Sequence, residues 1–332
     1  MLEHGGRLGC AAKQYGIPLQ QWLDLSTAIS PFSYPCPAIP ARLWHRLPDD
    51  DDGLMEAARN YYGSKHLLPV AGSQAAIQAL PLLRSPCRAA FLSLTYNEHR
   101  AAWQKHGHQV STLVPGNLCK QAEQLDVIVV ANPNNPTGET FDSATLLKAA
   151  TILANKGGWL IVDEAFIDAS DLDSLARQAS SSQSLIVLRS LGKFFGLAGA
   201  RVGFAMANEA LLEQLQEQLG PWPLSGPARY VAQCALEDVD WIDVTRKRLQ
   251  KASLRLADLL RSSDLESNGG TSLFQWVKSE AASELHQTLA SSAIFTRFFA
   301  EPQSIRFGLP QTEDEWERLD KALKHVSLSA TM

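Results

Sequence analysis

The sequence is best read outward from the stretch Ser190-Leu191-Gly192-Lys193-Phe194-Phe195-Gly196-Leu197-Ala198-Gly199-Ala200-Arg201-Val202-Gly203-Phe204. Lys193 lies there between small residues and a glycine-rich apolar turn, and residues 184–188 just before it read as a buried strand. An ammonium group at the end of a core strand is rarely left there without a task. Forming a Schiff base is one such task, because a desolvated lysine exposes a nucleophilic amine. The stretch therefore predicts a catalytic lysine, Lys193.

The composition indicates an ordinary globular protein with one large and one small domain. The chain has 332 residues, of which 45% are hydrophobic, and a formal net charge of −5, which argues against a nucleic-acid partner. No apolar run approaches the length of a membrane span, and the N-terminal residues lack a signal-peptide core. The five cysteines are scattered, which fits free thiols in a reducing cytoplasm. We therefore expect a cytoplasmic protein without a membrane partner.

Apolar runs rich in β-branched residues alternate with helical patterns through the middle of the chain. The runs are residues 89–94, 110–114, 127–131, 159–163 and 185–188. Such alternation predicts an α/β domain with a largely parallel sheet. Ligands bind at the carboxyl ends of the strands in such sheets, so the polar residues that follow each run are the candidate site.

A different pattern follows the Pro221-Trp222-Pro223 turn. One long amphipathic helix over residues 227–260 is expected to lead into strands at 273–278, 295–299 and 304–307 and a terminal helix at 313–325. This pattern predicts a smaller α+β domain with an antiparallel sheet. The predicted division is an N-terminal arm at 1–34, a large domain at 35–225 and a small domain at 226–332.

The polar residues at the strand ends match the needs of pyridoxal phosphate. This cofactor requires a lysine, an acid at its pyridine nitrogen, a donor to its ring hydroxyl, an aromatic face and an anion-binding loop. Lys193, Asp163, Asn135 and Tyr96 could meet the first four needs in that order. The loop could combine backbone N–H groups with two side chains, and its residues are Gly72, Ser73, Gln74, Ser190 and Arg201. Each has a plainer reading alone, such as a core tyrosine or a turn asparagine, and their joint occurrence is the specific signal.

Three motifs carry a family resemblance over nearly the whole chain. They are Asn135-Pro136-Thr137-Gly138, Asp163-Glu164-Ala165-Phe166 and Ser190-Leu191-Gly192-Lys193, the last followed by Arg201. Together they resemble the aspartate aminotransferase fold family of pyridoxal-phosphate enzymes, fold type I. The branch with histidinol-phosphate aminotransferases and threonine-phosphate decarboxylases is the most similar. The resemblance implies a mainly parallel seven-stranded sheet flanked by helices, a smaller α+β domain, and a homodimer with its active site at the subunit interface.

Two features favour the decarboxylases within this branch. The opening His4-Gly5-Gly6 and the later Leu23-Asp24-Leu25-Ser26 look like the start of cobalamin-pathway enzymes, and Phe166 replaces a tyrosine usual in the aminotransferases. The resemblance thus implies pyridoxal-phosphate-dependent decarboxylation of L-threonine O-3-phosphate to (R)-1-aminopropan-2-yl phosphate. Two alternatives stay open: a histidinol-phosphate or related aminotransferase, and a pyridoxal-phosphate-binding protein without catalysis.

The resemblance also suggests residues that bind a phosphorylated amino acid. Arg306 matches the family's carboxylate-binding arginine, and Asn135 would contact the substrate as well as the cofactor. His4, Ser26 and Thr27 are candidates for the substrate phosphate, although a simply packed arm explains them equally well.

The sequence departs from the family pattern at Leu47, where a tyrosine usually reaches the partner subunit's cofactor phosphate. Leucine cannot donate that hydrogen bond, so the sequence does not indicate which residue contacts the cofactor phosphate across the interface. His106-Gly107-His108 is read as a pair of surface histidines, since no acid or cysteine cluster lies nearby, and no metal site is expected.

Overall fold

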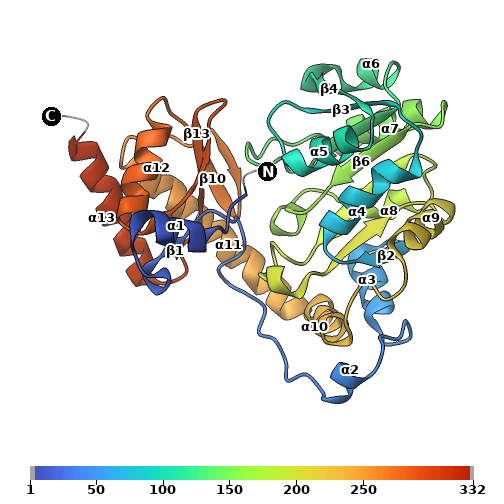
Figure 1. The fold of residues 1–332 in the computed structure, drawn as a ribbon, viewed down its shortest axis with the longest axis horizontal. Coiled ribbons are helices and arrows are strands. Elements are labelled where there is room, and N and C mark those ends of the chain that lie inside the picture. The colour runs from blue at the N-terminus through green and yellow to red at the C-terminus, as the bar shows by residue number, and fades with distance from the viewer. Residues whose placement is uncertain (1–3, 330–332) are drawn as a thin grey trace. The chain divides into compact units, whose positions relative to one another are not determined.

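The computed structural model describes residues 4–329, and the chain divides into two compact units (Figure 1). The sheet unit consists of Ser33–Asn135 and Glu139–Asp243, and the terminal unit consists of Met1–Phe32, Pro136–Gly138 and Val244–Met332. The division predicted from the sequence, at 1–34, 35–225 and 226–332, stays a prediction. Its outermost residues, 1–3 and 330–332, lie outside the described residues.

The sheet unit is built on a seven-stranded sheet in the order β2-β8-β7-β6-β5-β3-β4. Its strands are β2 (Leu67–Val70), β3 (Arg88–Leu92), β4 (Gln109–Leu113), β5 (Val127–Ala131), β6 (Trp159–Asp163), β7 (Leu185–Ser190) and β8 (Gly203–Met206). Strands β4, β3, β5, β6 and β7 run parallel, while β8 is antiparallel to both of its neighbours. The predicted α/β fold with a mainly parallel sheet is confirmed.

Five of these strands follow the predicted apolar runs, and two were not predicted. Strand β2 contains Pro69 and lies at the edge of the sheet, where a residue without an N–H group is tolerated. Strand β8 has only four residues and begins at Gly203, inside the stretch that the sequence presents as a turn. Both strands are apolar and buried but only four residues long, so neither stands out in the sequence as a separate strand.

Helices cover the sheet because the central strands are apolar on both faces. The helices of this unit are α2 (Arg42–His45), α3 (Leu54–Tyr62), α4 (Ser73–Ala79), α5 (Asn97–Lys105), α6 (Leu118–Ala122), α7 (Ser143–Ala154), α8 (Ala176–Ala179), α9 (Glu209–Leu219) and α10 (Gly226–Glu237). Side chains of α4, α5 and α9 form one buried cluster with alternate residues of the strands. Helix α7 packs against β6, and α8 packs against β7. Strands buried in this way read as continuous hydrophobic runs, as the sequence does.

The terminal unit contains an antiparallel sheet of four strands in the order β12-β13-β10-β9. These are β9 (Gly269–Thr271), β10 (Phe274–Lys278), β12 (Arg297–Phe299) and β13 (Ser304–Gly308). A second, parallel pair joins β1 (Leu23–Asp24) of the arm to β11 (Ile294–Phe295). The helices are α1 (Leu8–Tyr15), α12 (Ala282–Ser291) and α13 (Glu313–Ser329), and α11 (Val239–Arg261) enters from the sheet unit. The predicted smaller α+β fold is confirmed.

The predicted single helix over residues 227–260 is wrong. Helix α10 ends at Glu237 and α11 begins at Val239, and Asp238 between them has φ −84° and ψ 75°. The Asp238 carboxylate accepts a hydrogen bond from the backbone N–H of Trp241 at 3.0 Å. Because an aspartate cap satisfies an N–H group at a helix start, the chain begins a new helix there despite its continuous amphipathic pattern.

The acidic run Asp49–Asp52 contains a carboxylate that pairs with a buried arginine. Arg229 of α10 is 2% exposed and donates from Nε to Oδ2 of Asp52 at 2.5 Å and from Nη2 to Oδ1 at 2.8 Å. The same Asp52 accepts the Leu54 N–H at 3.1 Å, at the start of α3. The run therefore contains one carboxylate that links two helices.

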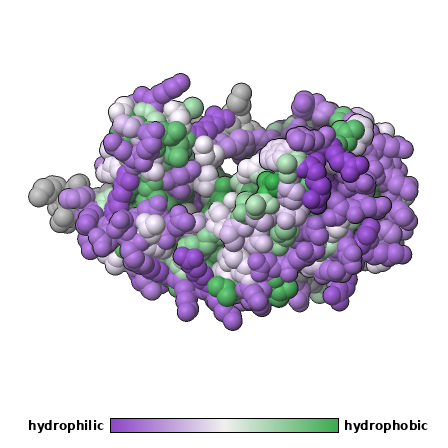
Figure 2. All heavy atoms as spheres, turned by 90° about the horizontal axis from the view of Figure 1, so that it is seen from below, coloured by the Kyte–Doolittle hydropathy of each residue, from purple (hydrophilic) through white to green (hydrophobic). Residues whose placement is uncertain are grey.

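The surface seen in Figure 2 is largely hydrophilic and carries scattered small hydrophobic patches. No helix between residues 4 and 329 is long and apolar enough to cross a membrane. The cysteines at 10, 36, 87, 119 and 234 are free thiols.

Candidate active site

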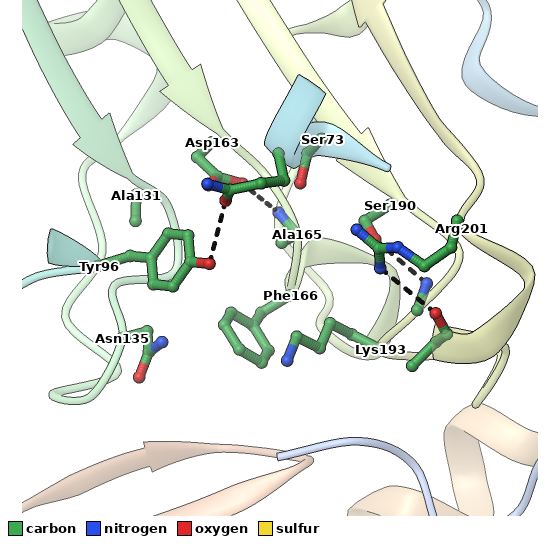
Figure 3. A pocket seen from close by; sticks show the side chains of 13 residues that line it. Ser73, Tyr96, Ala131, Asn135, Asp163, Ala165, Phe166, Ser190, Lys193 and Arg201 are labelled. Carbon is green, nitrogen blue, oxygen red and sulfur yellow. Dashed lines mark hydrogen bonds between the residues drawn. The ribbon is translucent and has the colours of Figure 1, made fainter. Parts of the chain in front are cut away.

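A pocket of about 160 Å³ opens in the sheet unit at the carboxyl ends of β5, β6 and β7 (Figure 3). The parallel register pairs Ala131 with Asp163 and Asp163 with Leu188, so the residues that end these strands gather at one edge. The lining consists of Ser73, Gln74, Tyr96, Ala131, Asn135, Asp163, Ala165, Phe166, Ser190, Gly192, Lys193, Ala198 and Arg201. Sequence reasoning named nine cofactor-binding residues, and all of them except Gly72 line this pocket.

Lys193 enters the pocket from the loop that follows β7. Its side chain is half-buried, and Nζ lies 5.5 Å from the centre of the Phe166 ring. Figure 3 shows the ammonium group directed along the ring into the pocket. The flanking Phe194 and Phe195 are fully buried, so they anchor the loop in the core while the lysine faces the cavity.

Asp163 is held from two sides at the end of β6. Its Oδ2 lies 3.0 Å from Nε2 of His99, and its Oδ1 accepts the N–H of Ala165 at 3.1 Å. Both Asp163 and His99 are buried, at 5% and 2% exposure. His99 lies on α5, 64 positions before Asp163 in the chain, so no local sequence pattern indicates this contact.

The turn after β5 uses two of its asparagines to fix its own shape. The Asn132 side chain donates to the Phe141 carbonyl and accepts the Phe141 N–H, at 3.2 and 3.0 Å. The Asn134 amide donates to the Leu94 carbonyl at 2.9 Å and accepts from the Thr95 hydroxyl at 2.8 Å. Asn135 is the asparagine whose side chain lines the pocket (Figure 3).

The backbone of Gly72, at the start of α4, lies close to the side chain of Arg201. Gly72 has φ +68°, and a Cβ atom built on it would lie 2.6 Å from Nη2 of Arg201. A Cβ atom on Gly203 would lie 2.6 Å from the backbone nitrogen of Ser73. These two glycines therefore leave room for Arg201 beside the first residues of the helix. Ser190, whose hydroxyl accepts the Gly192 N–H at 3.1 Å, lies beside Arg201 in Figure 3. Such a set of donors suits a phosphate group.

Tyr96 forms one wall of the pocket with its hydroxyl engaged. The hydroxyl donates to Oε1 of Gln74 at 3.1 Å, and the Gln74 amide donates to Oε2 of Glu98 at 2.9 Å. Burial, reinforced by the negative charges of Glu98 and Asp163, raises the pKa of Tyr96 to about 12. The phenol therefore stays neutral at physiological pH and presents its ring to the pocket.

A buried charge cluster lies beneath the pocket residues of β6 and β7. Arg189 precedes Ser190 and donates from Nη1 to Oε2 of Glu164 at 3.2 Å and from Nη2 to Oδ1 of Asp168. The Tyr61 hydroxyl donates to the same Asp168 oxygen at 2.8 Å. Burial alone would lower the pKa of Arg189, but Asp168 and Glu164 raise it overall. Burial raises the pKa of Glu164, against the opposing effect of Arg189.

Sequence reasoning missed this cluster, although one signal was present. Arg189 is an arginine inside an otherwise apolar strand, and such a residue needs buried partners. The parallel register places Leu188 opposite Asp163, which brings the next residues, Arg189 and Glu164, to adjacent positions.

In the terminal unit, two arginines stand opposite each other on β12 and β13. Arg297 and Arg306 are register partners, so their side chains leave the sheet on the same face. Arg306 is 5% exposed and donates from Nη2 to the Ser26 carbonyl at 2.5 Å. Burial and the positive charge of Arg297 lower the pKa of Arg306, while Asp24 raises it. Sequence reasoning named Arg306 and missed Arg297, which only the strand register identifies.

The arm residues predicted for the substrate phosphate also lie in the terminal unit. The Ser26 hydroxyl donates to Oδ1 of Asp24 at 2.6 Å and accepts the Gly6 N–H at 2.8 Å. Thr27 is half-buried and follows in the same turn. His4 and Arg297 line one groove of about 310 Å³ together with Arg7, Cys10 and His286. The arm thus brings His4 to the same groove as a β12 arginine.

Two further predictions concern residues outside these sites. Leu47 lies in the loop between α2 and α3 with 67% of its surface exposed. The interpretation of His108 as a surface residue is wrong, since it is 5% exposed, with Nε2 2.9 Å from the Pro81 carbonyl. Within residues 4–329, no group of three or more His, Cys, Asp or Glu side chains could hold a metal ion.

Comparison with known proteins places these features in one family. The family described as "Aminotransferase class I and II" matches residues 45–325. Threonine-phosphate decarboxylase of Pseudomonas aeruginosa is 52% identical over 97% of each chain, and that of Sinorhizobium sp is 38% identical over 98% of this chain and 99% of the other. Among solved structures, histidinol-phosphate aminotransferase of Sinorhizobium meliloti in complex with pyridoxal-5'-phosphate has a TM-score of 0.86 at 19% identity, over 99% of this chain and 96% of the other. The chain therefore belongs to the class I and II aminotransferase family.

Proposed function

We propose that this protein is a pyridoxal-phosphate-dependent carboxy-lyase that decarboxylates L-threonine O-3-phosphate. The single observation that carries the proposal is the 52% identity to a threonine-phosphate decarboxylase over 97% of both chains. The product would be (R)-1-aminopropan-2-yl phosphate, which supplies the aminopropanol part of cobalamin. The N-terminal His4-Gly5-Gly6 and the replacement of a tyrosine by Phe166 support the same activity.

The pocket of the sheet unit has the groups that pyridoxal phosphate requires. When bound, this cofactor joins an amino acid covalently and withdraws electrons from its α-carbon, so that a bond there can break. Lys193 would attach the cofactor, Asp163 would pair with its pyridine nitrogen, and Asn135 would donate to its ring oxygen. The fit is supported by the space that Gly72 and Gly203 leave beside Arg201, since a Cβ atom at either position would fill the phosphate-binding loop.

The contacts around Asp163 and Phe166 define the electrostatics of the pocket. His99 and the Ala165 N–H hold the two Asp163 oxygens, so the carboxylate has a fixed direction toward the cavity. Phe166 contributes a ring and no hydroxyl, so it cannot donate to the cofactor's ring oxygen as a tyrosine would. We propose that this difference leaves Asn135 as the side-chain donor to that oxygen.

The two arginines of the terminal unit match a substrate with two anionic groups. We propose that Arg306 binds the carboxylate and Arg297 the phosphate, with His4 and the turn of Ser26 and Thr27 as further phosphate contacts. Burial first, and the positive charge of Arg297 second, lower the pKa of Arg306, and an anion bound between the two arginines would offset both effects. Because decarboxylation requires the bond from Cα to the carboxylate to stand perpendicular to the cofactor ring, the direction that Arg306 gives the carboxylate would select the reaction.

Side-by-side assays on two phosphorylated substrates test the proposed function. Purified protein with pyridoxal phosphate is incubated with O-phospho-L-threonine, and in parallel with histidinol phosphate and 2-oxoglutarate. We expect carbon dioxide and aminopropanol phosphate from the first mixture and no glutamate from the second. Glutamate formation would instead support an aminotransferase, and cofactor binding without either turnover would support a non-catalytic binding protein. The Lys193→Ala variant is the control for enzyme-dependent product.

We also propose a cytoplasmic homodimer with its active site at the subunit interface. The exposed apolar side chains of Trp44 and Leu47, at 65% and 67%, support a surface that a second copy covers. A net charge of −5 argues against nucleic acid as a further partner. Light scattering coupled to size exclusion would give twice the monomer mass of 36.3 kDa for a dimer. A Leu47→Asp variant that shifts this mass to the monomer would identify the surface.

A further inference from the structure

We infer that the arm residues Gly5 and Gly6 are positioning residues for Arg306, because they fix the carbonyl of Ser26 that orients its guanidinium. This inference rests on the proposed function, in which Arg306 binds the substrate carboxylate. All of the contacts involved lie within the terminal unit.

The Ser26 turn is locked by hydrogen bonds from several directions. Oδ1 of Asp24 accepts both the Ser26 N–H at 2.9 Å and the Ser26 hydroxyl at 2.6 Å. The Gly6 N–H donates to the same hydroxyl at 2.8 Å. Leu25, the residue before Ser26, accepts the Gly308 N–H at 2.7 Å and donates to the Phe295 carbonyl at 2.7 Å. Because Ser26 is fully buried, its carbonyl has little freedom to turn.

That carbonyl faces Arg306 in the middle of β13. The Arg306 Nη2 atom donates to it at 2.5 Å, and the guanidinium lies 5.2 Å from the centre of the Phe274 ring. A backbone carbonyl orients the guanidinium fork without adding a formal negative charge of its own. Bidentate binding of a carboxylate depends on the direction of this fork, so moving the carbonyl would move the substrate carboxylate.

Glycine at position 5 is required by the close approach of the arm to this oxygen. A Cβ atom on Gly5 would lie 2.3 Å from the Ser26 carbonyl oxygen and 2.8 Å from its carbon. Contacts of this length essentially do not occur, so an alanine must displace the arm or the carbonyl. Gly6 adds a second constraint, since its φ of +80° is a conformation in which glycine is favoured over other residues.

The arm offers a matched control for a test of this inference. Gly9 belongs to the same arm, is exposed, and a Cβ atom built on it meets no atom within 4 Å. Gly5→Ala and Gly9→Ala therefore make the same chemical change with and without a clash at Ser26. We expect Gly5→Ala to raise KM for O-phospho-L-threonine about tenfold or more, with cofactor affinity as in wild type, and to lower Tm because the clash displaces a buried turn. Gly9→Ala should leave KM and cofactor affinity unchanged and should not lower Tm, since alanine favours helix α1 more than glycine does.

A double-mutant cycle with Arg306→Ala separates positioning from simple packing. If Gly5 acts through Arg306, then Gly5→Ala should cause no further loss of kcat/KM in the Arg306→Ala protein. Independent effects that multiply would overturn the inference, and so would an unchanged KM in the single variant. A loss of cofactor affinity that accompanies the KM change would also overturn it, since a wider disturbance of the structure would then explain the result.

A binding measurement provides a readout apart from turnover. Calorimetric titration of O-phospho-L-threonine into the Lys193→Ala protein should show a weaker Kd when Gly5→Ala is added, and an unchanged Kd would contradict the inference. Failure of the wild type to release carbon dioxide would instead overturn the proposed function. In that case the double-mutant cycle of Gly5→Ala and Arg306→Ala would be repeated with glutamate as the amino donor. Arg306 would still bind the carboxylate of glutamate, so this cycle would decide the role of Gly5 separately from the proposed function.

Discussion

Nε2 of His99 lies 3.0 Å from Oδ2 of Asp163, a residue that lines the pocket, and both side chains are buried. Asp163 is the proposed partner of the cofactor's pyridine nitrogen, so His99 holds the group that controls the cofactor's electronic state. A residue with this role need not touch the cofactor. Its effect should be measurable as cofactor affinity.

The His99→Ala variant should bind pyridoxal phosphate more weakly. Removing one hydrogen-bond partner of a buried carboxylate costs about 1–3 kcal/mol, so the cofactor Kd should rise about 5- to 150-fold. Fluorescence titration of the cofactor-free protein would measure it. His106→Ala removes a histidine from the far end of the same helix and should leave the Kd unchanged. Equal affinities in wild type and His99→Ala would mean that Asp163 is positioned without His99.

Lys193→Ala should abolish the visible absorbance of lysine-bound cofactor, because the amine that attaches the cofactor is gone. Lys193→Arg keeps the positive charge and should also lack this absorbance, which separates the loss of the amine from the loss of the charge. Borohydride reduction followed by peptide mass spectrometry should place the cofactor on Lys193 in the wild type. A label on another lysine would show that the wrong residue has been assigned.

Arg306→Ala and Arg297→Ala should differ in the substrate group that they affect. Truncating one partner of a desolvated ion pair costs about 2–5 kcal/mol, so either variant should lower kcat/KM for O-phosphothreonine by about 30-fold or more. With unphosphorylated threonine, only Arg306→Ala should cause a further loss, since the phosphate contact is already absent. Cofactor affinity is the control and should not change. An equal loss with both substrates in Arg297→Ala would remove this residue from the phosphate site.

Arg189→Met should destabilise the protein strongly. The variant leaves the carboxylates of Glu164 and Asp168 buried without the arginine, which costs about 3–5 kcal/mol. Arg88→Met is the matched control because Arg88 forms an exposed ion pair with Asp126 at 3.3 Å, and exposed pairs contribute little to stability. Urea unfolding of the two variants would measure the difference. Similar losses in both would show that the buried cluster contributes no more than a surface pair.

The Tyr96 hydroxyl should ionise only at pH about 12, since burial and the nearby carboxylates raise its pKa to about 12. A raised pKa favours the protonated form in the folded state, so the stabilisation that Tyr96 contributes is present below the ordinary value of about 10 and is lost as the pH rises to about 12. The tyrosinate absorbance of wild type minus Tyr96→Phe would report this step. Ionisation near pH 10 would show that the hydroxyl is more accessible than the structure indicates.

The sequence anticipated those parts of the site that follow strand ends. Asp163 ends one continuous apolar run, and Asn135 and Lys193 follow two others within five residues. Parallel strands bring such positions to one edge of a sheet. The runs also predicted five of the seven strands of the sheet. Strands β2 and β8 were missed because each has only four residues, too few for a periodic signal. Strand β2 also contains a proline, and β8 begins with a glycine.

Other features depend on contacts between residues that no local pattern relates. His99 meets Asp163 across 64 positions, and Arg306 meets the Ser26 carbonyl across 280. Asp238 divides a continuous amphipathic pattern into two helices through one side-chain hydrogen bond. Each of these depends on where a side chain points once its element is packed.

By itself, then, the sequence determined the class of fold and eight of the residues that line the pocket, because both follow from apolar periodicity and from short motifs near the ends of strands. Only the tertiary structure decided which groups orient these residues. His99 contacts Asp163, Arg189 pairs with buried carboxylates next to Ser190, and Gly5 packs against the Ser26 carbonyl. The physical reason is that hydrogen bonds and close contacts act over a few ångströms in space. Their partners are brought together by strand register and helix packing, which are not encoded in any one stretch of the chain.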